Sequence, residues 1–112
     1  MSQATVSLPQ PCSSIEALFT NHQAALAEKR RVYALAEQAD DADAEAAEAA
    51  CDAACDAEES VADMILARHA RSQIEFAIQA RVLLARGADP ADLFYYRPED
   101  LTRFIQEVAA RF

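Results

Sequence analysis

Two cysteines are the residues best placed to do chemistry in this chain. Cys51 and Cys55 stand four positions apart, a spacing that directs both thiols to one side of a helix. A zinc site takes four ligands, and the only histidines, His22 and His69, have no paired spacing with these cysteines. A disulfide between such positions of one helix is poorly oriented. We therefore interpret both cysteines as small residues beside a packed helix face, and we expect no metal site.

Other catalytic and cofactor sites lack their characteristic residues. A Cys-His nucleophile pair could combine Cys12, Cys51 or Cys55 with a histidine, but no local pattern supports it. A di-iron site in a helical bundle requires Glu-x-x-His pairs, and a phosphate loop requires several glycines; the chain has no such pair and one glycine. We interpret His22 as a hydrogen-bonded or half-buried core residue. We expect no catalytic residue, no cofactor and no enzymatic activity.

A line of acids is the surface feature with the sharpest functional interpretation. The acids recur at steps of three and four, which is the helical period. One helical turn separates neighbours by about 5.4 Å, near the spacing of phosphates along a DNA strand, so the line could occupy the groove of a basic nucleic-acid-binding protein. The simpler interpretation, which we favour, is the solvated face of an amphipathic helix. We call this set the acidic ribbon: Glu45, Glu48, Asp52, Asp56, Glu59 and Asp63.

Charge and hydropathy restrict the partners and the compartment. The net charge of −9 opposes direct binding to nucleic acid or to an anionic membrane, but a basic protein partner is compatible with it. No apolar run approaches the roughly 20 residues of a membrane span, and the N-terminus lacks the pattern of a secretion signal. With three cysteines, an odd number, we expect free thiols and a cytoplasmic protein.

The acidic ribbon requires a long helix over residues 40–66. Alanine is the best helix former, and small side chains let a partner helix approach closely. The absence of alternating β-branched runs favours an all-α fold. The face opposite the ribbon is predicted to be buried, and it comprises Ala47, Ala50, Ala54, Ala57, Val61, Met64 and Ile65.

A first helix is predicted before the helix at residues 40–66. Residues 1–12 contain two prolines and no periodicity, which predicts a flexible N-terminal arm. Ser13 and Glu16 have capping-box spacing, which predicts the helix start. A turn near residues 39–41, with aspartates suited to cap the second helix, would make an antiparallel helical hairpin. The apolar stripe of the first helix is Ile15, Leu18, Phe19, His22, Ala25, Leu26, Val32, Tyr33 and Ala36.

Three features divide the C-terminal part of the chain. The apolar stripe changes phase after Ile65, which favours a break around residues 69–72 with Ser72 capping a third helix. Gly87 is predicted to end that helix in the left-handed conformation. The pair Asp89-Pro90 and then Pro98 each predict a new helix start. The last helix should dock on the third through one apolar stripe, formed by Leu101, Phe104, Ile105, Val108 and Phe112.

Two short segments carry a resemblance. His22-Gln23-Ala24-Ala25, and Ser72 together with Ala80-Arg81, are similar to elements of a class of short alanine-rich helical proteins from alphaproteobacteria. The resemblance covers the middle of the chain, and residues 90–112 depart from it. It implies a helical protein but no particular activity.

The expected architecture is all-α: a long antiparallel helical hairpin followed by one or two shorter C-terminal helices. Residues 13–112 should form a single helical domain. Two alanine-faced helices bury little apolar area, so a second copy would complete the bundle by dimerisation. The first functional hypothesis is therefore a non-enzymatic, homodimeric association protein. The alternative is a small acidic inhibitor, similar to a DNA mimic, of a basic nucleic-acid-binding protein.

Overall fold

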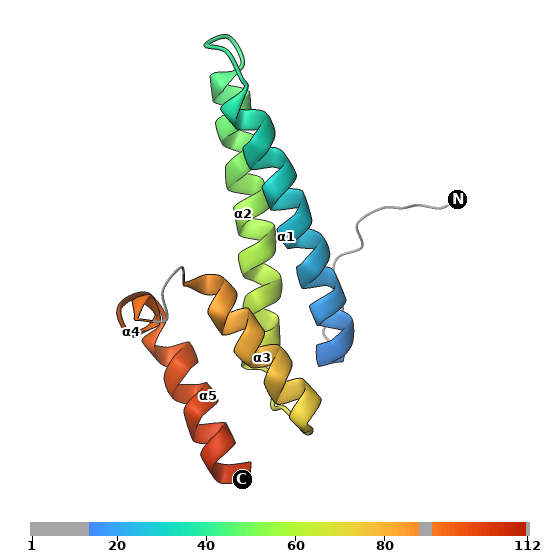
Figure 1. Ribbon diagram of the computed structural model, residues 1–112, viewed down its shortest axis with the longest axis vertical. Helices are drawn as coiled ribbons and strands as arrows, with labels where there is room; N and C mark the ends of the chain where they lie inside the picture. The colour runs from blue at the N-terminus through green and yellow to red at the C-terminus, as the bar shows by residue number, and fades with distance from the viewer. Residues whose placement is uncertain (1–13, 88–90, 112) are drawn as a thin grey trace, which may run out of the picture. The chain divides into compact units, whose positions relative to one another are not determined.

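The fold is all-α, as predicted. A computed structural model describes residues 14–87 and 91–111, and within these residues it contains helices and no strand (Figure 1). No helix in the same ranges has both the length and the apolar character needed to cross a membrane. The arm predicted at residues 1–12 lies outside the described residues. The helices are α1 (Ile15–Glu37), α2 (Ala44–Ala67), α3 (Gln73–Arg86), α4 (Asp92–Tyr96) and α5 (Pro98–Arg111).

The chain divides into two compact units, each described here by itself. The boundary falls inside α2, between Val61 and Ala62. Unit 1 contains α1 and most of α2, and unit 2 contains the last turns of α2 with α3, α4 and α5. The single domain predicted for residues 13–112 stays a prediction.

α1 begins at a serine cap and buries one face. Ser14 is the N-cap, and its Oγ accepts a hydrogen bond from the Ala17 amide at 3.0 Å. This corrects the predicted cap, Ser13, which lies outside the described residues, because Ser14 is the serine whose hydroxyl reaches the free amides of the first turn. The prediction that Tyr33 belongs to the apolar stripe of this helix is also wrong: Tyr33 lies 100° round the helix from Val32 and is exposed. The buried residues of α1 are Ile15, Leu18, His22 and Val32.

A short turn joins α1 to α2 at residues 38–43, where the sequence predicts one. Asp40 Oδ1 accepts a hydrogen bond from the Asp43 amide at 3.1 Å. The Asp43 carbonyl then accepts from the Ala47 amide, which is the first bond of the α2 ladder. The Asp40 side chain therefore closes the turn itself and does not cap the first turn of α2.

The buried face of α2 is rotated relative to the prediction. Of the predicted face, the residues that are buried are Ala54, Val61 and Ile65. Those that are half-buried are Ala47 and Met64, and those that are exposed are Ala50 and Ala57. Glu58 and Ala62 are buried instead. Because alanines occur on all sides of this helix, their positions do not define a face, and a polar contact of Glu58 decides it.

The predicted break between the second and third helices is confirmed. α2 ends at Ala67, and Ser72 is the N-cap of α3. Ser72 Oγ accepts a hydrogen bond from the Glu75 amide at 3.1 Å, and the Glu75 carboxylate accepts one from the Arg71 amide at 2.6 Å. Two amides at the start of α3 are thus satisfied by side chains, as in a capping box.

Gln79 holds the other side of the break. Its side chain is buried, and its amide group donates to the carbonyls of Ile65 and Arg68 at 3.1 and 2.8 Å. These carbonyls belong to the last turn of α2 and to the residue after it; the Ile65 carbonyl also accepts from the Arg68 amide at 3.3 Å. One glutamine of α3 therefore caps the end of α2.

α3 ends differently from the prediction. Gly87 follows the helix directly, but its φ of −122° and ψ of 133° are extended, not left-handed. The chain leaves α3 in a conformation that needs no positive φ, so the expected glycine cap is wrong. Asp89 and Pro90 lie outside the described residues. Pro98 is the first residue of α5, as predicted.

The last residue of α3 joins three helices of unit 2. The Arg86 guanidinium is buried and donates to Asp63 of α2 and to Asp100 of α5, each at 2.5 Å. Desolvation alone would lower the pKa of Arg86, but hydrogen bonding to Asp63 and the charges of both carboxylates raise it above its ordinary value. Arg86 therefore stays charged and holds both helices.

α5 packs against α3 without burying its apolar stripe completely. The rings of Phe104 and Phe76 meet edge to face, with centroids 6.3 Å apart. No described residue of α5 is fully buried, and Ile105 remains 55% exposed. The predicted docking therefore occurs on one side of the stripe, whose half-buried members are Leu101, Phe104 and Val108.

We predict that Gln79→Ala destabilises the protein by about 1–3 kcal/mol, because the carbonyls of Ile65 and Arg68 each lose a side-chain hydrogen bond. Urea unfolding followed by circular dichroism measures the free energy of unfolding. Gln23→Ala, at an exposed glutamine of α1, is the control and should change it little. Equal effects of the two variants would contradict the capping role.

Candidate functional site

The acidic ribbon is exposed along the part of α2 that belongs to unit 1. Glu45, Glu48, Asp52 and Asp56 are all exposed, and none forms an ion pair within the described residues. They lie on successive turns of one continuous helix. The structure therefore presents four of the six predicted residues as an uncompensated line of negative charge.

The other two ribbon residues have different surroundings. Glu59 is half-buried, and its Oε2 accepts from the Cys55 thiol at 3.7 Å. Asp63 belongs to unit 2, where it binds Arg86. Both carboxylates therefore have partners inside the protein. The ribbon available to another molecule is shorter than the sequence predicts.

A buried polar cluster lies between α1 and α2 in unit 1. His22 of α1 is 1% exposed, and its Nε2 lies 2.8 Å from Oε2 of Glu58, which is also buried. Lys29, about two turns further along α1, places its Nζ 3.5 Å from the other carboxylate oxygen. Each oxygen of Glu58 thus faces a separate nitrogen of α1. We call these three residues the Glu58 cluster.

The two ring nitrogens of His22 have different surroundings. Nε2 is hydrogen-bonded to the Glu58 carboxyl group, and Nδ1 is buried with no hydrogen-bond partner among the described residues. Lys29 adds a cation beside the same carboxyl group.

The two cysteines lie beside Tyr33, further along the same helix pair. Cys51 and Cys55 are half-buried free thiols. Desolvation raises the pKa of Tyr33, and the nearby thiols of Cys55 and Cys51 act in the same direction. The Lys29 ammonium lies 5.9 Å from the centre of the Tyr33 ring, within cation–π range. Within the described residues, no group of three or more His, Cys, Asp or Glu side chains could hold a metal ion.

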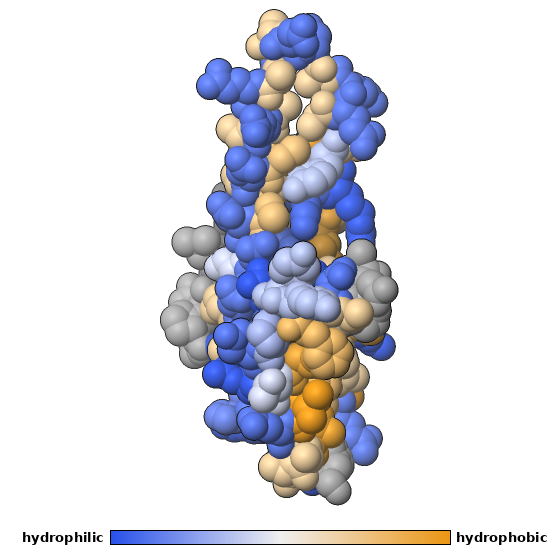
Figure 2. Space-filling view, turned by 90° about the vertical axis from the view of Figure 1, so that its left-hand side faces the viewer, coloured by the Kyte–Doolittle hydropathy of each residue, from blue (hydrophilic) through white to orange (hydrophobic). Residues whose placement is uncertain are grey.

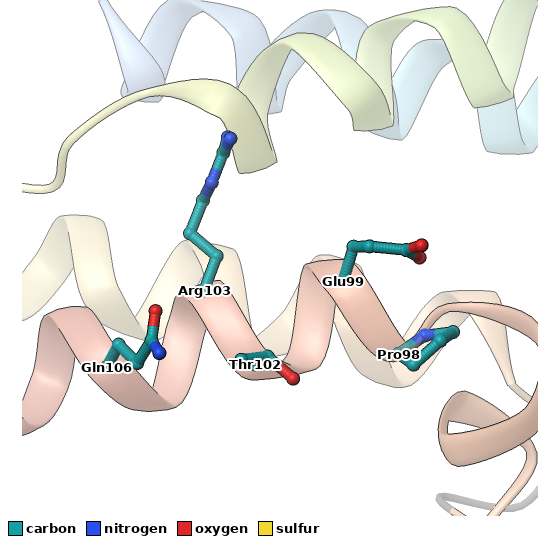
Figure 3. Close-up of a pocket in the computed structure, with 5 residues that line it drawn as sticks. All are labelled: Pro98, Glu99, Thr102, Arg103 and Gln106. Carbon is teal, nitrogen blue, oxygen red and sulfur yellow. The ribbon is translucent and has the colours of Figure 1, made fainter.

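The chemistry open to these groups is limited by access. A histidine oriented by a carboxylate is the geometry of a general base, but both side chains of this pair are buried away from any substrate. A separate open hollow of about 380 Å³ lies on α5 in unit 2 (Figure 3). All of its lining residues come from that one helix, and Arg103 extends from it toward the end of α2, near the Leu66 carbonyl. Such a hollow brings no groups together from different elements.

Sequence reasoning places His22 in the core but misses Glu58. Glu58 falls outside the spacing of the acidic ribbon and lies on the same side of the helix as Ala54, Val61 and Ile65. His22 likewise interrupts an apolar stripe, and the two residues lie at equal distances from Asp40 in the turn. Two ionisable residues at matching positions of adjacent helices are the signal that could have predicted the pair.

We predict that Glu58→Ala lowers the free energy of unfolding by about 3 kcal/mol, because it leaves the buried His22 ring without its acceptor. Urea unfolding measures the loss. Glu48→Ala, at an exposed ribbon position of the same helix, is the matched control and should have a small effect.

The double variant His22→Leu with Glu58→Leu should be more stable than Glu58→Ala. Replacing both members of a buried pair by apolar side chains removes their desolvation cost, and Lys29 is exposed enough to reach water. The single variants His22→Leu and Glu58→Leu are measured as well. If the double variant loses as much free energy of unfolding as the two single variants together, the two residues do not act as a pair.

Comparison with known proteins assigns no activity to this site. The chain matches no protein-family model, no curated protein and no solved structure. The resemblance to alanine-rich helical proteins of alphaproteobacteria therefore stays a prediction. The function has to be inferred from the geometry described above.

Proposed function

We propose that this chain is a non-enzymatic helical protein that acts by association, as a homodimer. One observation carries the proposal: unit 2 exposes many large apolar or aromatic side chains for its size. Exposed patches of such residues are typical of protein-protein contact surfaces, in which tyrosine and phenylalanine are enriched. The residues are Ile74, Leu84, Phe94, Tyr95, Tyr96 and Ile105.

Two arrangements of the dimer are compatible with this proposal. In one, the α1–α2 pair is an antiparallel hairpin, and two hairpins complete a four-helix bundle. In the other, the contact is made by unit 2. Among the described residues of unit 1, the large exposed apolar side chains are Tyr33 and Leu35. This distribution favours unit 2 as the contact.

We predict that sedimentation equilibrium of the purified chain gives a mass of twice 12.2 kDa at micromolar concentration. The exposed apolar area of unit 2 supplies the driving force. The measurement should be made over a concentration series, since a reversible dimer dissociates on dilution. A monomer throughout the micromolar range would contradict the proposal.

A second candidate function rests on the four exposed acids of unit 1. Because Glu45, Glu48, Asp52 and Asp56 form no ion pair within the described residues, their charges remain available to a basic protein. Binding of this kind would be fast and sensitive to salt. The chain would then act as an acidic inhibitor of a nucleic-acid-binding protein.

We predict, under this second function, that changing the four acids to Gln or Asn abolishes capture of a basic partner from the source cell. The matched control removes four other exposed acids, by Glu37→Gln, Asp41→Asn, Asp43→Asn and Glu99→Gln. The two variants have the same net charge, so a difference between them reports position. Equal capture by both variants would exclude the ribbon as the binding surface.

A further inference from the structure

One side of α5 is covered only in part: Leu101 and Val108, which lie between Phe104 and Ile105 round the helix, are half-buried, and the rest of this side is exposed. Ile105 is 55% exposed, and its neighbours on the same side are exposed or half-buried. Phe104, which contacts Phe76, points to a different side, 100° round the helix. On the face of the molecule that Figure 2 presents, apolar side chains gather in the lower half. We call this side the α5 edge; it comprises Leu101, Thr102, Ile105, Val108 and Ala109.

The α5 edge contains no charged side chain. Two carboxylates of the helix have partners on other elements: Asp100 binds Arg86, and Glu107 lies 2.8 Å from His69. The third, Glu99, borders the edge, because it lines the hollow of Figure 3 together with Thr102. Two copies of a chain with a net charge of −9 repel each other wherever their acids meet. A carboxylate-free apolar surface is therefore where a second copy meets the least repulsion.

The order of large and small residues makes the edge complementary to itself. When two copies of α5 run antiparallel about a twofold axis at Ile105, positions equally far from that residue face each other. Leu101 then faces Ala109 of the second copy, and Thr102 faces Val108. Ile105 meets its own copy at the axis, and on either side of it a larger side chain faces a smaller one, which lets the helices approach closely. The axis also lies near the middle of Pro98–Arg111, so the whole helix takes part.

A dimer contact requires more surface area than α5 alone supplies, and we infer that α4 forms its border. A specific interface buries about 800 Å² on each partner, more than one short helix supplies. α4 packs against α5, and its Phe94, Tyr95 and Tyr96 are 68%, 81% and 76% exposed. Each aromatic ring can bury about 150–250 Å². Rings from α4 can therefore supply the remaining area.

We propose that the α5 edge is the self-association surface of this protein, and that it pairs antiparallel with the same edge of a second copy about a twofold axis at Ile105. The proposal rests on the homodimer proposed above and identifies its contact. It differs from the two-hairpin bundle, in which α5 would lie outside the interface.

The test compares Ile105→Glu with Leu35→Glu in the full chain by sedimentation equilibrium. Both side chains are exposed, by 55% and 56%, so neither change buries a charge in the isolated chain. Ile105→Glu places two carboxylates at the twofold axis and should raise the dimer dissociation constant at least tenfold. Leu35→Glu, on α1 of unit 1, adds the same charge outside the α5 edge and should leave the constant within about twofold of the wild type, as expected outside an interface.

The outcomes separate the two proposals. If the wild type is a dimer and both variants dissociate equally, or neither does, the α5 edge is not the contact, whereas the homodimer itself stands. If the wild type stays monomeric, a second copy does not bind the α5 edge, and the self-association proposal is wrong. The edge would then bind a different protein. Should Ile105→Glu lose helical circular dichroism, Ala109→Glu decides instead, since this exposed position faces Leu101 of the second copy; a folded Ala109→Glu chain that remains a dimer would refute the register.

Discussion

The carboxylate of Glu58, buried between α1 and α2, is the constraint on which the structure of unit 1 depends. Alanine-rich helices can slide or rotate against each other at little cost, because one small side chain resembles the next. A buried carboxylate must instead be paired, and both of its oxygens meet nitrogens of α1, from His22 and Lys29. This requirement selects one rotation of α2 and one register between the helices, as a single polar residue can do in a coiled coil.

Unit 2 achieves specificity by a related means. Its helices are joined by polar groups that satisfy one another across elements: Gln79 caps the end of α2, and Arg86 bridges Asp63 and Asp100. Its buried apolar residues lie mostly on the end of α2, on α3 and on α4, whereas α5 has no fully buried residue in the described part of the chain. Polar contacts of this kind hold a defined arrangement while leaving apolar surface for other contacts.

The features predictable from sequence were those set by local chemistry. Serine at position 72 and the change of phase after Ile65 located the helix break, and Pro98 located the start of α5. The spacing of the residues did not predict which face of α2 is buried, because alanines occur on all sides of that helix. The residue that determines the buried face, Glu58, is charged and so gave no apolar signal. Gly87 correctly marked the end of α3, but its left-handed conformation was predicted wrongly, because the residue is extended. The exposed surfaces of α4 and α5 depend on packing that spacing alone does not show.

The exposure of the aromatic residues has a consequence for spectroscopy. The chain has no tryptophan and three tyrosines, and Tyr33, Tyr95 and Tyr96 are all exposed. Unfolding moves the rings of Tyr95 and Tyr96 from one aqueous environment to another, so their fluorescence changes little when the helices melt. Covering the rings of α4 by another molecule would shield them from solvent and quenchers. In this protein the natural fluorophores therefore report on encounters at the surface, whereas the state of the core has to be followed by backbone signals.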